Sequence, residues 1–146
     1  MNQEDKYLLL RDICARLPYG VKILTHYKID NFRNHSSIET LSGINIYGFI
    51  NSEESDILRD IGKPYLFPLS SMTEEQKYDF YCNFIENDCD FDDFKEFYFE
   101  NNEWHKMLTS IDDCESIIDW FNKNHFDYRC LIPKGLAIDA TGKNIY

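Results

Sequence analysis

The sequence has no long hydrophobic run and few glycines or prolines. Its 146 residues include 6 Gly and 4 Pro, which excludes collagen-like and low-complexity chains. No stretch approaches the roughly 20 consecutive apolar residues that a membrane-spanning helix needs. The beginning of the chain lacks the basic and apolar segments of a secretory signal, so we expect a cytoplasmic protein.

The sequence also lacks the short motifs of common enzyme and metal sites. It contains no CxxC, HExxH, GxSxG, P-loop or GxGxxG pattern. The five cysteines are scattered, which predicts buried, reduced thiols and no zinc site. The four histidines are far apart, and DCDFDD has Asp93 where a calcium loop requires glycine. We therefore expect neither a metal nor a cofactor.

Positive charge is scarce in the second half of the chain. The net charge is −11, and residues 73–146 carry 17 acids, 7 bases and 15 of the 23 aromatic residues. Residues 1–72 are nearly neutral, with 9 acids and 8 bases. The acidic half would repel a phosphate backbone, so a basic protein is the partner that this charge favours. The weaker alternative, a nucleic-acid surface on the near-neutral half, would use Lys22, Lys28, Arg33 and Lys63.

The apolar pattern of the first 28 residues predicts a helix followed by a strand. Residues 3–17 repeat apolar side chains at helical spacing, and Pro18 ends this helix. In residues 21–28, β-branched and aromatic side chains alternate, as is typical of a half-buried strand.

The rest of the first half predicts further short strands. Residues 30–37 are polar and indicate a turn, and residues 38–50 indicate two short strands or one bent strand. Pro64 and Pro68 place the extended segment 63–72 at a sheet edge. We expect a small antiparallel sheet or an open SH3-like barrel.

The second half predicts helices. Thr73 and Gln76 form a capping box ahead of the first helix. Its inward stripe is predicted to consist of Tyr78, Tyr81, Cys82 and Ile85. Two more helices are predicted, one within residues 88–108 and one within residues 110–126 that ends at Asn122–Asn124. In the first of them, Phe91, Phe94, Phe97 and Tyr98 recur at helical spacing. We therefore predict one α+β domain over residues 1–146, with a helix and β-rich half (1–72) and an acidic, aromatic helical half (73–146).

Two stretches carry a resemblance: KPYLFPLSSMTEEQ at residues 63–76 and DWFNKNHFDYRCLIPKGLAI at residues 119–138. They resemble the patterns K-P-Y-L-x-P-x-S-S-M-T-E-E-E and W-L-N-x-x-H-F-D-Y-R-G-L-I-x-x-G-L-A. These patterns are typical of a family of small, acidic, uncharacterised proteins in gut-bacterial genomes and their phages or prophages. The chain departs from them at Gln76, Phe121 and Cys130, where glutamate, leucine and glycine are usual. The resemblance implies a cytoplasmic protein of a mobile element, and it implies no activity.

The second stretch places four chemically capable residues within five positions. In an enzyme, His125 would act as a base oriented by Asp127, beside Tyr128, and Arg129 would hold an anionic substrate. In a structural corner, His125 would meet a helix C-terminus, while Phe126 and Tyr128 enter the core. Asp127 and Arg129 would then pair with the backbone or with each other. No nucleophile stands at a recognised spacing, so we favour the corner and keep a small enzyme as the alternative.

The most acidic stretch, Glu86–Glu100, holds seven acids against the single base Lys95. A solvated helix face explains such charges one at a time. The net charge of −10 on residues 73–146 is nevertheless larger in magnitude than the net charge of about 2 to 8 that solubility requires. We therefore predict a non-enzymatic protein-interaction module that binds a basic protein, in its sharpest form as a nucleic-acid mimic or inhibitor. The predicted contact residues are Glu86, Asp88, Asp90, Asp92, Asp93 and Glu96.

Overall fold

The computed structural model has two compact units. It describes residues 1–30, 33–44, 46, 60–85, 89–101, 103, 104, 106, 108 and 114–146. One unit consists of Met1–Leu66 and Arg129–Tyr146, and the other of Phe67–Tyr128. The units therefore divide after Leu66 and not at residue 72. That the whole chain acts as one domain stays a prediction.

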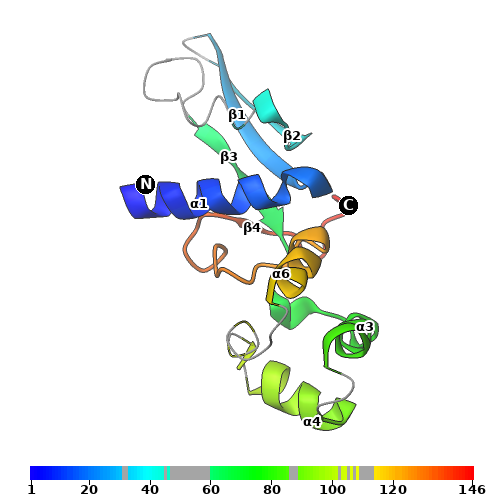
Figure 1. Cartoon of the computed structure of the whole chain (residues 1–146). Coiled ribbons are helices and arrows are strands. Elements are labelled where there is room, and N and C mark those ends of the chain that lie inside the picture. The colour runs from blue at the N-terminus through cyan, green and yellow to red at the C-terminus, as the bar shows by residue number, and fades with distance from the viewer. Residues whose placement is uncertain are drawn as a thin grey trace. The chain divides into compact units, whose positions relative to one another are not determined.

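The first unit combines a helix with a four-stranded sheet. Its elements are α1 (Gln3–Arg16), η1 (Leu17–Tyr19), β1 (Lys22–Asp30), β2 (Arg33–Thr40), β3 (Asp60–Leu66) and β4 (Ile138–Asp139). The strand order is β2-β1-β3-β4, in which β1 is antiparallel to β2 and β3, and β4 is parallel to β3. Figure 1 shows α1 lying across one face of this open sheet. The predicted α+β class is confirmed, and the last strand makes the sheet mixed.

The core of the first unit lies between α1 and the sheet. Leu9 and Ile13 of α1 belong to one buried cluster with Val21 and Ile23 at the start of β1. Along the strand, Val21, Ile23 and Thr25 are buried in alternation, which confirms the strand predicted from this pattern. The helix ends with a turn in which Gly20 has a φ of 64°, in the left-handed region that glycine tolerates.

The polar segment predicted as a turn at residues 30–37 is instead mostly strand, because β2 begins at Arg33. The polar side chains of Ser36 and Ser37 bond to side chains of β1, so this part of the strand forms without an alternation of apolar residues. The hydroxyls of Thr25 and Ser37 lie 3.0 Å apart, and His26 Nδ1 lies 2.7 Å from the Ser36 hydroxyl. Of the strands predicted over residues 38–50, residues 38–40 do belong to β2. The chain leaves the sheet after Thr40, and residues 41–44 and 46 are not strand.

The segment with Pro64 was predicted at a sheet edge, and this prediction was wrong for the strand as a whole. β3 lies between β1 and β4 in the sheet. The parallel pairing with β4 begins only at Tyr65, opposite Ile138, while Pro64 lies opposite Ile23 of β1. A proline lacks the N–H that a ladder needs. The short second ladder therefore accommodates Pro64, because it starts one residue later.

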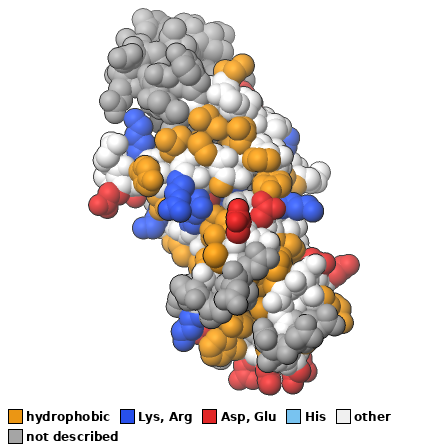
Figure 2. Space-filling view, viewed as in Figure 1, with side chains coloured by type: hydrophobic (Ala, Val, Ile, Leu, Met, Phe, Trp, Pro, Cys, Tyr) orange, Lys and Arg blue, Asp and Glu red, His pale blue; other side chains and the backbone are white. Residues whose placement is uncertain are grey.

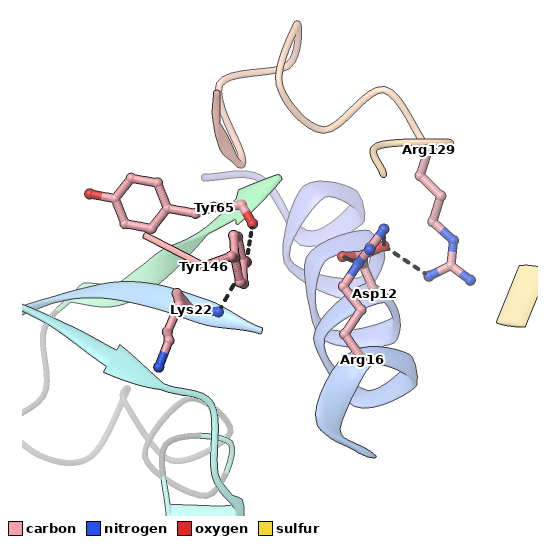
Figure 3. Close-up of polar contacts among 6 residues, drawn as sticks. All are labelled: Asp12, Arg16, Lys22, Tyr65, Arg129 and Tyr146. Carbon is pink, nitrogen blue, oxygen red and sulfur yellow. Dashed lines mark hydrogen bonds and ion pairs between the residues drawn. The ribbon is translucent and has the colours of Figure 1, made fainter. Parts of the chain in front are cut away.

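The side chain of Tyr146 joins β1 to β3. Its hydroxyl donates to the Tyr65 carbonyl at 2.7 Å and accepts the Lys22 N–H at 3.1 Å, as Figure 3 shows. Burial raises the pKa of Tyr146 to about 12, above its ordinary value of 10.0. The neutral phenol is therefore the form that the folded protein favours.

Stability should depend on the ionisation of Tyr146. Because the pKa is higher in the folded than in the unfolded chain, this contribution is complete below pH 10 and is lost as the pH rises towards 12. Chemical denaturation across this range should show the loss in the wild type. Tyr146→Phe should remove it and cost about 1 kcal/mol at neutral pH, because two backbone groups lose a partner. Identical pH profiles for the two proteins would contradict this role.

Gly62 is a position at which the two neighbouring strands approach closely. A Cβ placed there would lie 1.8 Å from the Leu24 carbonyl oxygen of β1, so the backbone would have to shift. We expect Gly62→Ala to destabilise the fold by about 2 kcal/mol or more. The control is Gly43→Ala, whose Cβ would meet nothing within 4 Å. Thermal denaturation should separate the two variants, and equal melting temperatures would contradict the close approach.

The second unit is helical. Its elements are η2 (Leu69–Ser71), α3 (Glu74–Phe84), α4 (Phe91–Lys95), η3 (Glu96–Glu100) and α6 (Cys114–Lys123). The predicted capping box is confirmed: the Gln76 N–H donates to the Thr73 hydroxyl at 3.2 Å, and the Thr73 N–H donates to Gln76 Oε1 at 2.9 Å. A cluster of aromatic rings centred on Phe80, Phe94 and Phe121 forms the core.

The inward stripe of α3 differs from the prediction. Tyr81 and Ile85 are buried as predicted, but Tyr78 is 55% exposed and Cys82 is also exposed. Phe80 is fully buried in their place and stacks on Phe121 with ring centroids 5.4 Å apart. The helix is thus rotated towards Phe80, because its ring is wholly apolar, whereas the ring of Tyr78 carries a hydroxyl that can stay in water.

The cysteines were predicted to be buried, and four of them are exposed. All five are free thiols, and Cys89 alone is partly covered. Cys14 and Cys82 lie on the outer faces of α1 and α3, where the inner faces are filled by larger side chains. None of the described helices is long and apolar enough to cross a membrane.

Candidate functional site

The HFDYR corner begins where α6 ends. His125 has a φ of 59°, the left-handed conformation that commonly ends a helix. Its carbonyl accepts the Phe67 N–H at 2.9 Å, and the Asp127 N–H donates to the Phe67 carbonyl at 2.8 Å. Phe67 and Phe126 thereby form a parallel bridge. The backbone of the corner joins the first and last segments of the second unit.

The aromatic rings of the corner are part of the core. Phe126 and Tyr128 are both buried. Tyr128 stacks on Phe121 at 5.6 Å between ring centroids, and Phe126 stacks on Trp120 at 5.7 Å. These two rings therefore have the positions that the structural interpretation of the corner predicts.

Arg129 belongs to the first unit, where its partner is a carboxylate that the sequence analysis missed. Its Nη1 lies 3.5 Å from Asp12 Oδ1, and Arg16 Nε lies 2.8 Å from Asp12 Oδ2 (Figure 3). The side chains of Asp12 and Arg16 have no exposed surface. The available signal was an acid and a base spaced i, i+4, but the buried face of α1 is formed by Leu9, Asp12, Ile13 and Arg16 and differs from the predicted stripe of Leu10, Ile13, Cys14 and Leu17.

Three of the four residues of the enzyme hypothesis make separate structural contacts and are not gathered in one site. Arg129, which would hold an anionic substrate, is bound to Asp12. Asp127 is buried with its N–H bonded to Phe67, and the Tyr128 ring is stacked in the core. Across the part of the chain that the structure describes, no three His, Cys, Asp or Glu side chains are grouped to hold a metal ion.

Cys130 follows the corner and has a φ of 56°, a conformation that costs a residue with a Cβ about 1 kcal/mol or more. The resembling family pattern has glycine at this position. We expect Cys130→Gly to raise the free energy of unfolding by about 0.5–1 kcal/mol, measured by chemical denaturation. Cys130→Ala is the matched control, because it removes the thiol but keeps the Cβ. An equal gain in both variants would attribute the effect to the thiol and not to the backbone.

The predicted partner-binding acids have different structural roles. Asp90 caps α4, because its Oδ1 accepts the N–H groups of Asp92 and Asp93 at 2.9 and 3.0 Å. This carboxylate therefore stabilises the helix itself. Glu86 and Asp88 lie outside the described residues.

The remaining acids of the set project from the helix. Asp92 is 90% exposed, and Asp93 and Glu96 are also exposed. Figure 2 shows acidic side chains gathered at the lower end of the view, over α4. Three carboxylates are thus exposed within about one and a half turns of helical chain.

Two lysines near this surface, Lys77 and Lys95, are partly covered by the protein itself, whereas Lys106 is exposed. Lys77 donates to Glu74 at 2.7 Å and lies 5.7 Å from the centre of the Phe99 ring. Lys95 lies 3.6 Å from Glu74 and 5.8 Å from the centre of the Phe91 ring. The hydrogen bond from Lys77 holds the pKa of Glu74 below its ordinary value. Lys95 also lies 3.9 Å from Asp92, so one acid of α4 has an ion pair, which is exposed and therefore weak.

An exposed aromatic ring, whose exposure the sequence analysis did not predict, adjoins these acids. Within η3 the Asn101 N–H donates to the Glu96 carbonyl at 3.0 Å, which widens this turn of the helix. Tyr98 and Phe99 pack against the core, whereas Phe97 is 45% exposed. The change of helical phase at Glu96 separates these rings, and the periodicity of a regular helix could not reveal it.

Comparison with known proteins adds no relative. No family model, curated protein or solved structure matches the chain. The resemblance carried by residues 63–76 and 119–138 therefore stays a prediction. The function proposed below is argued from the described residues alone.

Proposed function

We propose that the chain is a non-enzymatic protein-interaction module that binds a basic protein through its second unit. The binding surface, called the acidic face below, consists of Asp92, Asp93, Glu96 and Phe97. The observation that carries the proposal is the ring of Phe97, which is 45% exposed next to exposed carboxylates. An apolar anchor with charges around it is the usual composition of an interaction hot spot and its rim.

The carboxylates of the acidic face would act mainly before contact. Exposed charges add little to stability, so Asp92, Asp93 and Glu96 have no large structural effect to explain them. An exposed surface with an excess of one charge does attract an oppositely charged partner over roughly a Debye length, about 8–10 Å. The acidic face therefore supports a fast, salt-sensitive association with a basic surface.

The aromatic ring of Phe97 would supply affinity once contact is made. Lys106 lies 5.5 Å from the centre of this ring, so the exposed ring already has a cation above one part of it. A lysine or arginine of the partner would interact with the ring and the neighbouring Glu96 in the same manner.

In its most specific form, the hypothesis is that the basic partner is a nucleic-acid-binding protein. Spaced carboxylates would take the place of phosphates on its surface. Such a mimic or inhibitor is consistent with the proposal that the chain comes from a phage or other mobile element, acting in the host cytoplasm.

The test compares capture of host proteins by two variants with the same change in net charge. The first carries Asp92→Asn, Asp93→Asn and Glu96→Gln, and it keeps Asp90 because that residue caps α4. We expect a nuclease-resistant partner of the wild type to bind this variant at least about tenfold more weakly, equivalent to about 1.4 kcal/mol. Raising the salt concentration should weaken wild-type binding in the same direction. Mass spectrometry identifies the partner, and titration of the purified pair measures the change.

The matched control carries Glu4→Gln, Glu75→Gln and Glu115→Gln, three exposed acids outside the acidic face. It should bind like the wild type, and both variants should keep the wild-type melting temperature. Equal losses in the two variants would indicate an effect of net charge alone. Unchanged binding by the first variant would contradict the proposal that the acidic face binds the partner. Competition by DNA or RNA for the same partner distinguishes a mimic from other interaction modules.

A further inference from the structure

The outer edge of the sheet in the first unit is formed by β2. Among the described strands, β1 is the one that bonds to β2. Proteins usually protect such an edge with proline, lysine or a bulge, because its free N–H and C=O groups can pair with another strand. β2 has the sequence RNHSSIET, with neither proline nor lysine. Its register against β1 is regular from Asn34 to Thr40 and shifts at the beginning of β2, between the partners Lys28 and Asp30.

The pairing with β1 fixes which backbone groups of β2 point outward. The Leu41 N–H donates to the Val21 carbonyl at 2.8 Å, so this pair faces inward. In an antiparallel ladder, every second pair then faces inward as well, here the pairs of Glu39 and Ser37 with β1. The backbone groups of Ser36, Ile38 and Thr40 therefore point away from β1.

The side chains at this edge favour pairing. Ile38 is 51% exposed, and a β-branched side chain of this kind packs well against a neighbouring strand. Ser36 and Thr40 on either side of it are exposed and small. A strand laid against this edge would cover Ile38 without burying a charged group among these three.

We propose that β2 pairs with β2 of a second copy of this chain, in an antiparallel arrangement about a twofold axis. A strand pairs with its own copy in this way through one self-complementary surface. β2 carries Arg33 at its beginning and Glu39 near its end, so an antiparallel copy brings ends of opposite charge together. The first unit carries 11 bases and 10 acids, so two copies can meet through it without the repulsion that the second unit, with 16 acids and 4 bases, would produce.

Charge also selects the register of this pairing. The outward groups belong to even-numbered residues, so hydrogen-bonded pairs across the axis join even positions with even positions. With Ser36 on the axis, position 33 of each copy lies opposite position 39 of the other. This register places Arg33 of each copy at the position opposite Glu39 of the other, and a cross-strand pair of opposite charges contributes about 0.2–1 kcal/mol.

The first test asks whether the edge carries the association. Sedimentation velocity of the full chain should show a monomer–dimer equilibrium that moves towards dimer as concentration rises. Ile38→Lys should weaken dimerisation at least about tenfold, because a lysine on an edge opposes strand pairing. The control is Ile44→Lys, which changes another exposed isoleucine outside β2 and should leave dimerisation unchanged. A wild type that stays monomeric, or an Ile38→Lys variant that dimerises normally, would overturn the proposal.

The second test asks for the register. Arg33→Glu and Glu39→Arg should each weaken self-association, because like charges then lie opposite each other. Mixed together, the two variants should form a heterodimer, because both cross-strand contacts again join opposite charges. Lys134→Glu is the control for the mixture and should not associate with Glu39→Arg in this way. Failure of the two variants to recover on mixing would overturn the register with Ser36 on the axis.

Discussion

The buried carboxylate of Asp12 is the interaction on which the first unit depends. It binds Arg16 within α1 and Arg129 in the segment where the chain re-enters this unit. Arg16 pairs this carboxylate at 2.8 Å, and Arg129 adds a longer contact at 3.5 Å that ties the returning segment to α1. The returning segment contributes Leu131 and Leu136 to the core and then forms β4. The contact with Arg129 therefore joins the first helix to residues that are far apart from it in the sequence.

Asp12 is buried and holds parts of the first unit together, whereas the acids of the acidic face are exposed and contribute little to the fold of the second unit. The neighbouring Asp90 is the exception, because it begins the five-residue α4, which would be marginal by itself. Phe94 anchors the same helix, since it is fully buried and contacts the rings of Phe80 and Tyr81. The acidic face thus begins on a short helix, which is stabilised by the packing of Phe94 and by the cap of Asp90. Its charged residues are free to change without loss of the core.

Sequence reasoning succeeded where the causes were local. The capping box of Thr73 follows from side chains three residues apart, and the strand at β1 follows from alternation. It failed where a partner elsewhere in the chain decided the outcome. β2 is polar because its side chains bond to β1, and Pro64 is tolerated because the second ladder starts after it. The pairing of Arg129 with Asp12 has no local signal at Arg129, whereas the exposure of Phe97 depends on a change of helical phase.

The division of the chain has a consequence for synthesis. The second unit is continuous in sequence, so all of its residues leave the ribosome before the first unit is complete. The first unit must wait for its last strand, and its partly made sheet lacks β4 during that interval. The bridge between Phe67 and Phe126 shortens the effective loop that separates β3 from β4, which lowers the entropy cost of closing the sheet. Early folding of the second unit would therefore accelerate completion of the first.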